Sequence, residues 1–186
     1  MAGESTAQRT SSAYTAAAIC ARFHVKREAG KLLRDGMGPH QFVRALMADK
    51  QYVSAIDFLA YALAAREGVW WGCLCLQHAC GNSLSPEEKI GCRAAVQWVM
   101  DASDENRVAA QAPAQQAGLK SPAGQLAMAA SQTSQGLDPA PVAASRAVAA
   151  AVKMISIKAD PELVSETQRL FVELGLAWLK PDSTRS

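Results

Sequence analysis

Residues 52–80 of the chain, YVSAIDFLAYALAAREGVWWGCLCLQHAC, decide its fold class. The apolar residues of the first part recur at intervals of four, three and four, which is the spacing of one side of an α-helix. They are Tyr52, Ile56, Leu59 and Leu63. The next part, residues 69–79, is apolar on nearly every helical face, and a helix of this kind is buried on all sides. We therefore predict an all-α protein with residues 69–79 at the centre of its core.

Turn-forming residues bound this stretch on both sides. Upstream, the run Asp35-Gly36-Met37-Gly38-Pro39 predicts a break, with Pro39 in the first turn of a helix that carries one apolar stripe. That helix is expected to end near Asp49-Lys50 and to form an antiparallel hairpin with the helix from Tyr52. Downstream, Arg66-Glu67-Gly68 predicts an interruption, and Cys80-Gly81-Asn82 predicts the end of the central helix.

Farther along the chain, the helix signals differ in strength. Ser85-Pro86-Glu87-Glu88 is a capping box with proline at the first helical position, and it predicts a helix to about residue 102. A further helix over residues 104–116 contains Pro113, which predicts a kink or a division. Residues 118–141 carry the weakest pattern, from which we expect a short helix after Ser121-Pro122 and then an exposed loop.

Two long helices are predicted to close the chain. The first has Val148, Val152 and Ile155 on one face. The second is predicted to begin at Asp160, which would cap it, and to end before Pro181. Its expected apolar stripe is Leu163, Leu170, Leu174 and Trp178.

These patterns predict a compact multi-helix bundle, or an irregular array of about eight helices in helical hairpins. No strict repeat is visible, so a regular solenoid is not predicted. We expect a disordered leader over residues 1–12 and a single helical domain over residues 13–180, which begins with a helix over residues 13–34. Within it, residues 118–141 are expected to be a weakly ordered connection, and residues 181–186 to be a tail.

Composition and charge argue against several classes of protein. A hydrophobic content of 49% in 186 residues excludes global disorder. A net charge of +2 argues against a nucleic-acid binder that works by bulk charge. The N-terminus has no secretory pattern and no apolar stretch is long enough for a bilayer, so we expect a cytoplasmic protein without membrane insertion. Five cysteines, an odd number, argue against a disulfide framework.

The sharpest candidates for chemistry are Cys73, Cys75, His78, Cys80 and Cys92, because zinc prefers thiolate and imidazole ligands. Cys73 and Cys75, however, lie about 200° apart around a helix, so both cannot face one metal ion. We favour small apolar thiols that pack in a tight core, and we expect no metal and no cofactor.

Two cysteine–histidine pairs have spacings that permit contact on a helix, Cys20 with His24 and Cys75 with His78. Neither pair has a glycine elbow, an oxyanion-hole loop or a third residue to orient the base. We therefore predict that the protein is not an enzyme. A metal- or thiol-dependent enzyme centred on residues 73–80 stays open as an alternative.

Three features are candidates for partner binding. Trp70 and Trp71 point about 100° apart, so one ring is expected to reach the deepest core while the other covers a groove, joins an interface or packs against a neighbouring helix. Asp57 is expected to pair with Arg66 or another cation at a helix junction, or to contact a partner. A basic cluster near the N-terminus is either a solvated helix face or a docking surface for an acidic partner. It consists of Arg22, Lys26 and Arg27.

Residues 42–80 resemble an uncharacterised bacterial family, a domain of unknown function. The resemblance lies in a helix with the pattern FLA-x-AL, at residues 58–63, joined to a helix with the pattern RE-x-VWW-x-CLC, at residues 66–75. Residues 118–124 and 175–177 look similar to the family as well, whereas the chain departs from it after Ala123. Members of this family occur beside type VI secretion components, so the resemblance implies an accessory role in loading an effector onto the secretion spike. It transfers no catalytic residues.

The leading hypothesis is therefore a cytoplasmic adaptor or co-chaperone that binds a protein partner, such as a secretion effector or its adaptor chaperone. The partner segment is expected in a groove between helical hairpins, or on the basic N-terminal helix. A third hypothesis is a regulatory domain that senses a small ligand in an apolar pocket.

Overall fold

The computed structural model describes residues 14–81, 83–133, 138–158 and 161–182. All regular structure in these residues is helical, which confirms the predicted fold class. The helices are α2 (Ala16–Cys20), α3 (Arg27–Gly30), α4 (Pro39–Ala48), α5 (Tyr52–Ala62), α6 (Ala65–Cys80), α7 (Pro86–Met100), α8 (Asp104–Ala109), α9 (Gln111–Ala117), α10 (Pro122–Ser131), α11 (Val142–Ser156) and α12 (Val164–Leu176), with a 3-10 turn η1 (Pro161–Leu163) before α12.

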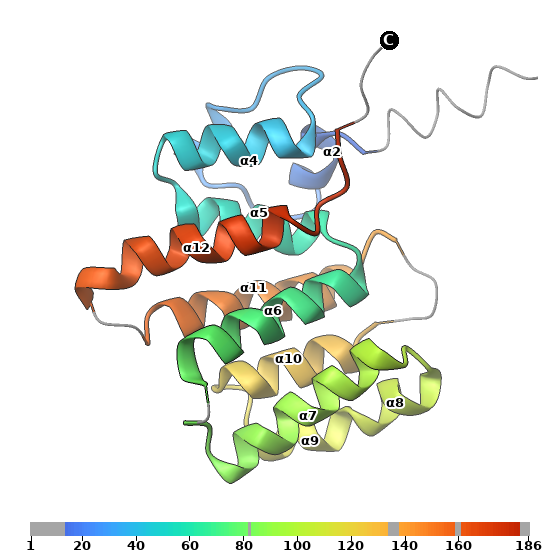
Figure 1. Cartoon of the computed structure of the whole chain (residues 1–186). Helices are drawn as coiled ribbons and strands as arrows, with labels where there is room; N and C mark the ends of the chain where they lie inside the picture. Colours follow the sequence, from blue (N-terminus) through green and yellow to red (C-terminus); the bar gives the residue numbers. More distant parts are fainter. Residues whose placement is uncertain (1–13, 82, 134–137, 159–160, 183–186) are drawn as a thin grey trace, which may run out of the picture.

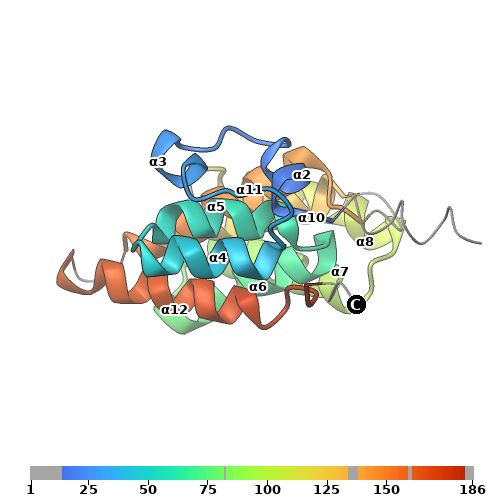
Figure 2. The ribbon, with the colours of Figure 1, turned by 90° about the horizontal axis from the view of Figure 1, so that it is seen from above.

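The helices stack in successive rows (Figure 1), with α4 and α5 at one end and α7, α8 and α9 at the other. The C-terminal helices α11 and α12 fold back into the stack, where each of them contacts both α5 and α6. Seen from above (Figure 2), α12 and the N-terminal helices α2 and α3 flank α4 and α5 from opposite sides. One hydrophobic core runs through these rows.

Where a strong local signal exists, the predicted helix boundary is confirmed. Pro39 is in the first turn of α4, and α4 packs against α5 as a hairpin. The Ser85 hydroxyl accepts a hydrogen bond from the backbone of Glu88, whose carboxylate accepts from the Ser85 backbone, so the capping box is formed. Gly81 ends α6 with a φ of +50°, a value that glycine adopts without steric cost.

The prediction of an interruption at residues 66–68 is wrong, because α6 begins at Ala65 and includes them. The break lies two residues before Arg66, at Ala64, whose backbone is extended. Glu67 in the first turn suits the positive end of the helix dipole, which favours starting the helix there. Residues 69–79 are also not buried throughout, because residues 77–79 are exposed.

The region with the weakest sequence pattern contains one of the most buried helices. In α10 the backbone approaches its neighbours closely, since a Cβ atom on Gly124 would lie 2.1 Å from the carbonyl oxygen of Gly118. Leu126 packs over Gly72 of α6 with similar closeness. The short helix predicted after Ser121-Pro122 is therefore confirmed as α10, whereas the prediction of a weakly ordered connection is wrong for residues 122–131. Small residues allow the close packing, and a helix covered on all sides shows no polar face in its sequence. Residues 134–137 lie outside the described residues.

The N-terminal segment is two short helices, α2 and α3, rather than one helix over residues 13–34. The chain turns between them at Arg22 and Phe23. The Phe23 ring stacks on the Tyr61 ring of α5 with centroids 4.5 Å apart, and Arg22 donates to the Tyr61 carbonyl oxygen at 2.7 Å. These contacts with α5 stabilise the turn in place of a continuous helix. Residues 1–12 of the predicted leader, and residues 183–186 of the tail, lie outside the described residues.

The helix predicted over residues 104–116 is divided at Ala110 into α8 and α9. Pro113 explains the position of the division, because proline has no N–H and its ring clashes with the carbonyl four residues earlier, at Ala109. The prediction of a division is confirmed, although the break falls before the proline.

The apolar stripe predicted for the last helix is wrong, because Leu163 and Trp178 are exposed. The buried side of α12 instead carries Phe171, Val172 and Gly175. A Cβ atom on Gly175 would lie 2.8 Å from Leu59, so glycine lets α12 approach α5 and α6 closely. The predicted face of α11, by contrast, is buried as expected. Asp160, the predicted cap, lies outside the described residues.

Candidate binding groove along helices α6 and α7

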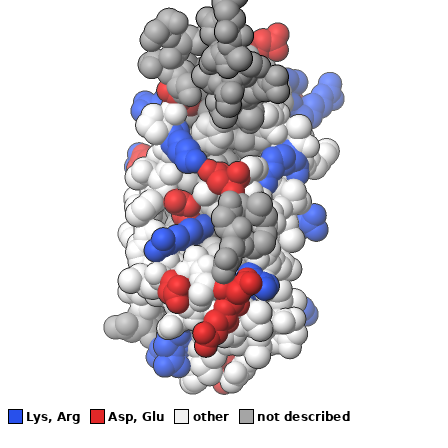
Figure 3. Space-filling model, turned by 90° about the vertical axis from the view of Figure 1, so that its right-hand side faces the viewer, with Lys and Arg blue, Asp and Glu red and all other residues white. Residues whose placement is uncertain are grey.

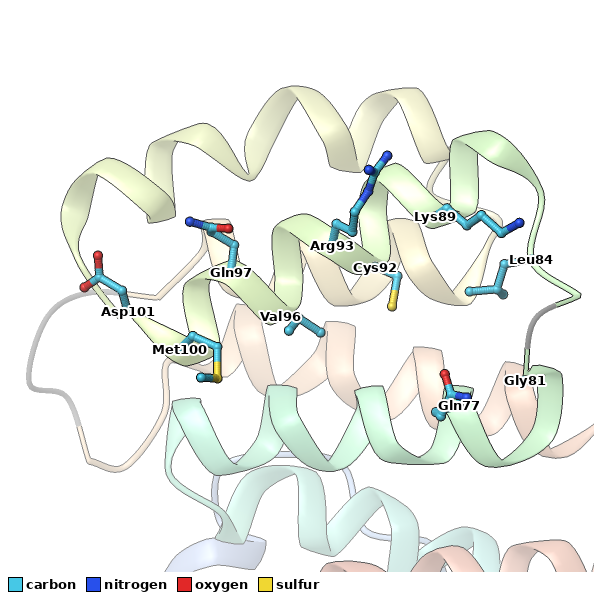
Figure 4. Close-up of a pocket in the computed structure, with 10 residues that line it drawn as sticks. All are labelled: Gln77, Gly81, Leu84, Lys89, Cys92, Arg93, Val96, Gln97, Met100 and Asp101. Atoms are coloured by element: carbon cyan, nitrogen blue, oxygen red, sulfur yellow. The ribbon is translucent and has the colours of Figure 1, made fainter.

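Helices α6 and α7 pack together, and two hollows open along their contact. The larger has a volume of about 620 Å³ (Figure 4) and the smaller a volume of about 310 Å³. Met100, the last residue of α7, lines both hollows, so we treat them as one α6–α7 groove. The larger hollow is lined by Gln77, Gly81, Leu84, Lys89, Cys92, Arg93, Val96, Gln97, Met100 and Asp101, and the smaller by Arg66, Glu67, Trp70, Val99, Met100 and Trp178.

The two adjacent tryptophans of α6 have different environments. Trp71 is completely buried, and its indole N–H donates to the carbonyl oxygen of Phe171 at 2.8 Å. Trp70 is only half-buried and lines the smaller hollow. The expected divergence of the two rings is thus confirmed. Trp71 stabilises the core and offers no surface to a partner, whereas Trp70 does.

Two further apolar residues complete this end of the groove. Met100 is 71% exposed, and Trp178, which follows α12, is 43% exposed. Sequence reasoning missed both of them, and it assigned Trp178 to a buried stripe. Met100 is the last residue of α7, and Trp178 lies beyond the last turn of α12. The helical spacing of apolar residues no longer predicts which side chain is buried once the helix has ended.

Arg66 joins the start of α6 to the end of α7. Its Nε donates to the Val99 carbonyl oxygen at 2.6 Å, and one Nη lies 3.5 Å from the Met100 carbonyl oxygen. The last carbonyls of a helix have no partner within the helix, so Arg66 caps the end of α7, where Met100 lies. Asp57 was expected to pair with Arg66 or another cation at a helix junction, and the second alternative is confirmed: Asp57 of α5 pairs with Lys153 of α11 at 2.5 Å.

The charged residues of the larger hollow are mostly basic. Lys89 and Arg93 are exposed on its rim, and Asp101 lies at the end near Met100. Across the face of the molecule in Figure 3, by contrast, acidic and basic side chains are interspersed. The rim of the larger hollow thus carries two basic side chains and one acidic side chain beside an apolar wall.

The candidate metal ligands are not brought together, and the described residues contain no group of three or more His, Cys, Asp or Glu that could hold a metal ion. Cys75 is buried, whereas His78 is exposed and its ring lies edge-on to Phe171 with centroids 6.3 Å apart. Cys73 instead contacts Cys92 of α7, a pairing that sequence reasoning missed because nothing in the local pattern shows which helix covers α6.

Hydrogen bonding within this thiol pair separates the acidities of its two members. The hydrogen bond from Cys73 lowers the pKa of Cys92 to about 7, against the opposing effect of burial. The same hydrogen bond, together with burial, raises the pKa of Cys73 well above its usual value. Cys92 is therefore the more readily ionised thiol of the two.

The other predicted pair, Cys20 with His24, is separated by the end of α2 at Cys20. Burial raises the pKa of Cys20 to about 11, whereas His24 is exposed and lies outside the helix. Cys20 and His24 therefore do not lie on consecutive turns of one helix, and the Cys20 thiol is not ionised at neutral pH.

The basic cluster predicted near the N-terminus is not a single surface. Arg22 turns inward, where it donates to the carbonyl oxygens of Tyr61 and Ala140, and burial lowers the pKa of its guanidinium. Lys26 and Arg27 are exposed at the start of α3. Arg22 therefore holds the N-terminal segment on α5, and only the other two cations are available at the surface.

The described residues form an all-α array of helices with an open groove between two of them. The chain belongs to a family of unknown function (DUF6931), whose model matches residues 42–179. The match includes residues 42–80, and it confirms the expectation of a family of unknown function. No curated protein matches the chain, and no solved structure matches it. None of the helices in the described residues has the length and apolar character needed to cross a membrane.

Proposed function

We propose that this protein is a non-enzymatic adaptor that binds another protein by receiving an amphipathic helix of the partner in the α6–α7 groove. The observation that carries the proposal is the convergence of Trp70, Met100 and Trp178 at one end of the groove. Exposed tryptophan is enriched at the energetic centres of protein interfaces, and methionine adapts its shape to an incoming apolar side chain.

The shape and charge of the groove favour a helical occupant. Helix α7 forms one wall with 15 residues, a length of about 22 Å, which accommodates about four turns of a partner helix. Figure 4 shows Cys92 and Val96 directed from α7 towards α6, so the floor of the larger hollow is apolar. Lys89 and Arg93 on the rim favour acidic residues on the polar side of the partner helix.

The class of partner follows from the family resemblance rather than from the groove. On the strength of the resemblance, which implies a place beside type VI secretion components, we propose a secretion effector or its adaptor chaperone as the partner, and a co-chaperone role in loading the effector onto the secretion spike. Trp70 keeps the role of a direct contact, which the sequence suggested. Arg66, a partner-binding candidate from the sequence, instead caps the end of α7 at the groove.

The test is recovery of the partner from the native bacterium with the tagged full-length chain. Met100→Glu places a charge where the two hollows of the groove meet and is expected to abolish recovery of the effector or chaperone. Ile157→Glu is the matched control, since Ile157 is 68% exposed at the end of α11 and lies outside the groove. Deletion of the gene is expected to reduce export of the same effector.

Two results would contradict the proposal. Recovery of the partner that survives Met100→Glu but not Ile157→Glu would place the binding surface elsewhere. Normal export of every effector in the deletion strain would remove the secretion role.

A further inference from the structure

Cys73 and Cys92 form a thiol pair between α6 and α7 that the proposed adaptor role does not use. Cys73 lies on α6 with 5% of its surface exposed, and Cys92 lies on α7, half-buried, where it lines the larger hollow. Figure 4 shows the sulfur of Cys92 directed towards α6. The Cys73 thiol is in hydrogen-bond contact with this sulfur. One member of the pair is thus accessible from a hollow and the other is enclosed behind it.

We propose that Cys92 and Cys73 are a reversible oxidation site, at which a hydroperoxide converts the two thiols into a disulfide between α6 and α7. Redox-responsive cysteines share this arrangement, in which an accessible thiol lies next to a second thiol that resolves the first oxidation product. The hollow of about 620 Å³ gives a small peroxide access to the Cys92 sulfur.

The reaction has two steps. In the first, the Cys92 thiolate attacks the terminal oxygen of the hydroperoxide, the O–O bond breaks, and Cys92 becomes a sulfenic acid while hydroxide leaves from hydrogen peroxide, or alkoxide from an organic hydroperoxide. In the second, the Cys73 sulfur attacks the sulfenic sulfur, and the Cys73 proton and the sulfenic hydroxyl leave as water. The two thiols lose two electrons in total, and the hydroperoxide is the oxidant that accepts them.

The remaining cysteines lack this arrangement, and all of them lie in the described part of the chain. Burial raises the pKa of Cys20, Cys75 and Cys80, and this leaves each of them as a neutral thiol at neutral pH. Cys92 is the exception, because the hydrogen bond from Cys73 stabilises its thiolate. The hydrogen bond therefore activates the attacking sulfur and also holds the resolving sulfur beside it.

Disulfide formation changes the wall of the larger hollow. The two sulfurs of a disulfide lie about 2 Å apart, which is closer than thiols in hydrogen-bond contact. The two sulfurs must therefore move closer together, and the two helices become covalently linked beside the hollow. This consequence holds whichever molecule occupies the groove.

The proposal is tested on the reduced full-length chain treated with hydrogen peroxide, followed by maleimide labelling in denaturant and intact mass measurement. Before oxidation five thiols are labelled. After oxidation three are expected, because two of the five are consumed, and peptide mapping is expected to find Cys73 joined to Cys92. Dithiothreitol is expected to restore all five. Persistent labelling of five thiols, a different pairing, or a disulfide between two chains would overturn the proposal.

Substitutions distinguish the formation of the sulfenic acid from the formation of the disulfide, and a rate measured on the unmodified chain adds a test that needs no variant. In Cys73→Ser, dimedone is expected to trap Cys92 as a sulfenic acid, because the resolving thiol is gone. Cys80→Ser is the matched control and is expected to form the disulfide normally, since Cys80 is also half-buried. In the unmodified chain, Cys92 is expected to react with maleimide about tenfold faster than Cys80 at neutral pH, because thiolate content governs the rate. Equal rates would remove the activation that the proposal requires.

Discussion

The two sides of α6 differ in how completely they are covered. On the side that faces α12, Trp71 is fully buried and hydrogen-bonded, and Gly175 packs so closely that a Cβ atom there would lie 3.0 Å from the Trp71 ring. On the side that faces α7, two hollows open, and Trp70 and Met100 reach solvent. The same helix therefore contributes to the closed core on one side and to an open groove on the other.

This difference separates residues that stabilise the fold from residues available for binding. A side chain on the closed side has no access to a partner, so substitution there is expected to act on the free energy of unfolding. An exposed side chain at the groove contributes little to folding, so substitution there is expected to act on binding. The following substitutions test that separation, from the largest expected effect on stability to the smallest.

Trp71→Ala is expected to lower the free energy of unfolding by about 3–5 kcal/mol, because it leaves a large cavity between α6 and α12. The measurement is chemical denaturation followed by circular dichroism. Trp71→Phe keeps most of the volume and loses the hydrogen bond to Phe171, so a smaller loss is expected. A cost below about 1 kcal/mol for the alanine variant would show that this side is not closed.

Gly175→Ala is expected to lower the free energy of unfolding by about 1–3 kcal/mol, because the added methyl group meets Leu59 and Trp71. Gly30→Ala is the control, since no heavy atom lies within 4 Å of a Cβ atom at that position. The control is expected to be neutral or slightly stabilising in thermal unfolding. Equal effects of the two substitutions would contradict the close approach of α12.

Arg66→Met is expected to cost about 1 kcal/mol in urea denaturation, because the carbonyl oxygens at the end of α7 lose their donor. Arg93→Met, at an exposed position on α7, is expected to change the free energy of unfolding by less than about 0.5 kcal/mol. Tryptophan fluorescence is expected to shift in the Arg66 variant alone, since the end of α7 that borders the Trp70 hollow loses its hydrogen bonds to Arg66. An unchanged spectrum together with unchanged stability would show that Arg66 does not position the groove.

Met100→Glu is expected to have the smallest effect, a change of less than about 0.5 kcal/mol in the free energy of unfolding, because Met100 is 71% exposed. Thermal unfolding of this variant beside Ile157→Glu provides the measurement. A loss above about 1 kcal/mol would mean that Met100 belongs to the core and that the groove is not an independent surface.

Sequence reasoning succeeded where one helix contains its own signal. The capping box at Ser85, the proline at Pro39 and the glycine at Gly81 each act on the backbone within one helical turn, and each marks a boundary in the structure. It failed where burial depends on distant helices. Leu170 and Phe171 are neighbours on α12, and only contact with α5 and α6 makes Phe171 the buried one.

The candidate site was predictable only in part. The angle between Trp70 and Trp71 follows from helix geometry, so their separation into different environments could be foreseen. Met100, Trp178 and Cys92 could not be foreseen, because their roles depend on which helix ends beside α6. Arg66 was recognised as important, but its partner is the end of α7 and not Asp57.

By itself, the sequence determined the all-α class, the α4–α5 hairpin and the apolar character of α6, because helical spacing and capping act over a few neighbouring residues. The tertiary structure alone decided that α11 and α12 fold back against α5 and α6, and that α7 covers the other side of α6 incompletely. The physical reason is that local spacing shows which face of a helix is apolar. Which helix covers this face, and how tightly it packs there, depends on contacts between residues as far apart in the sequence as Trp71 and Phe171.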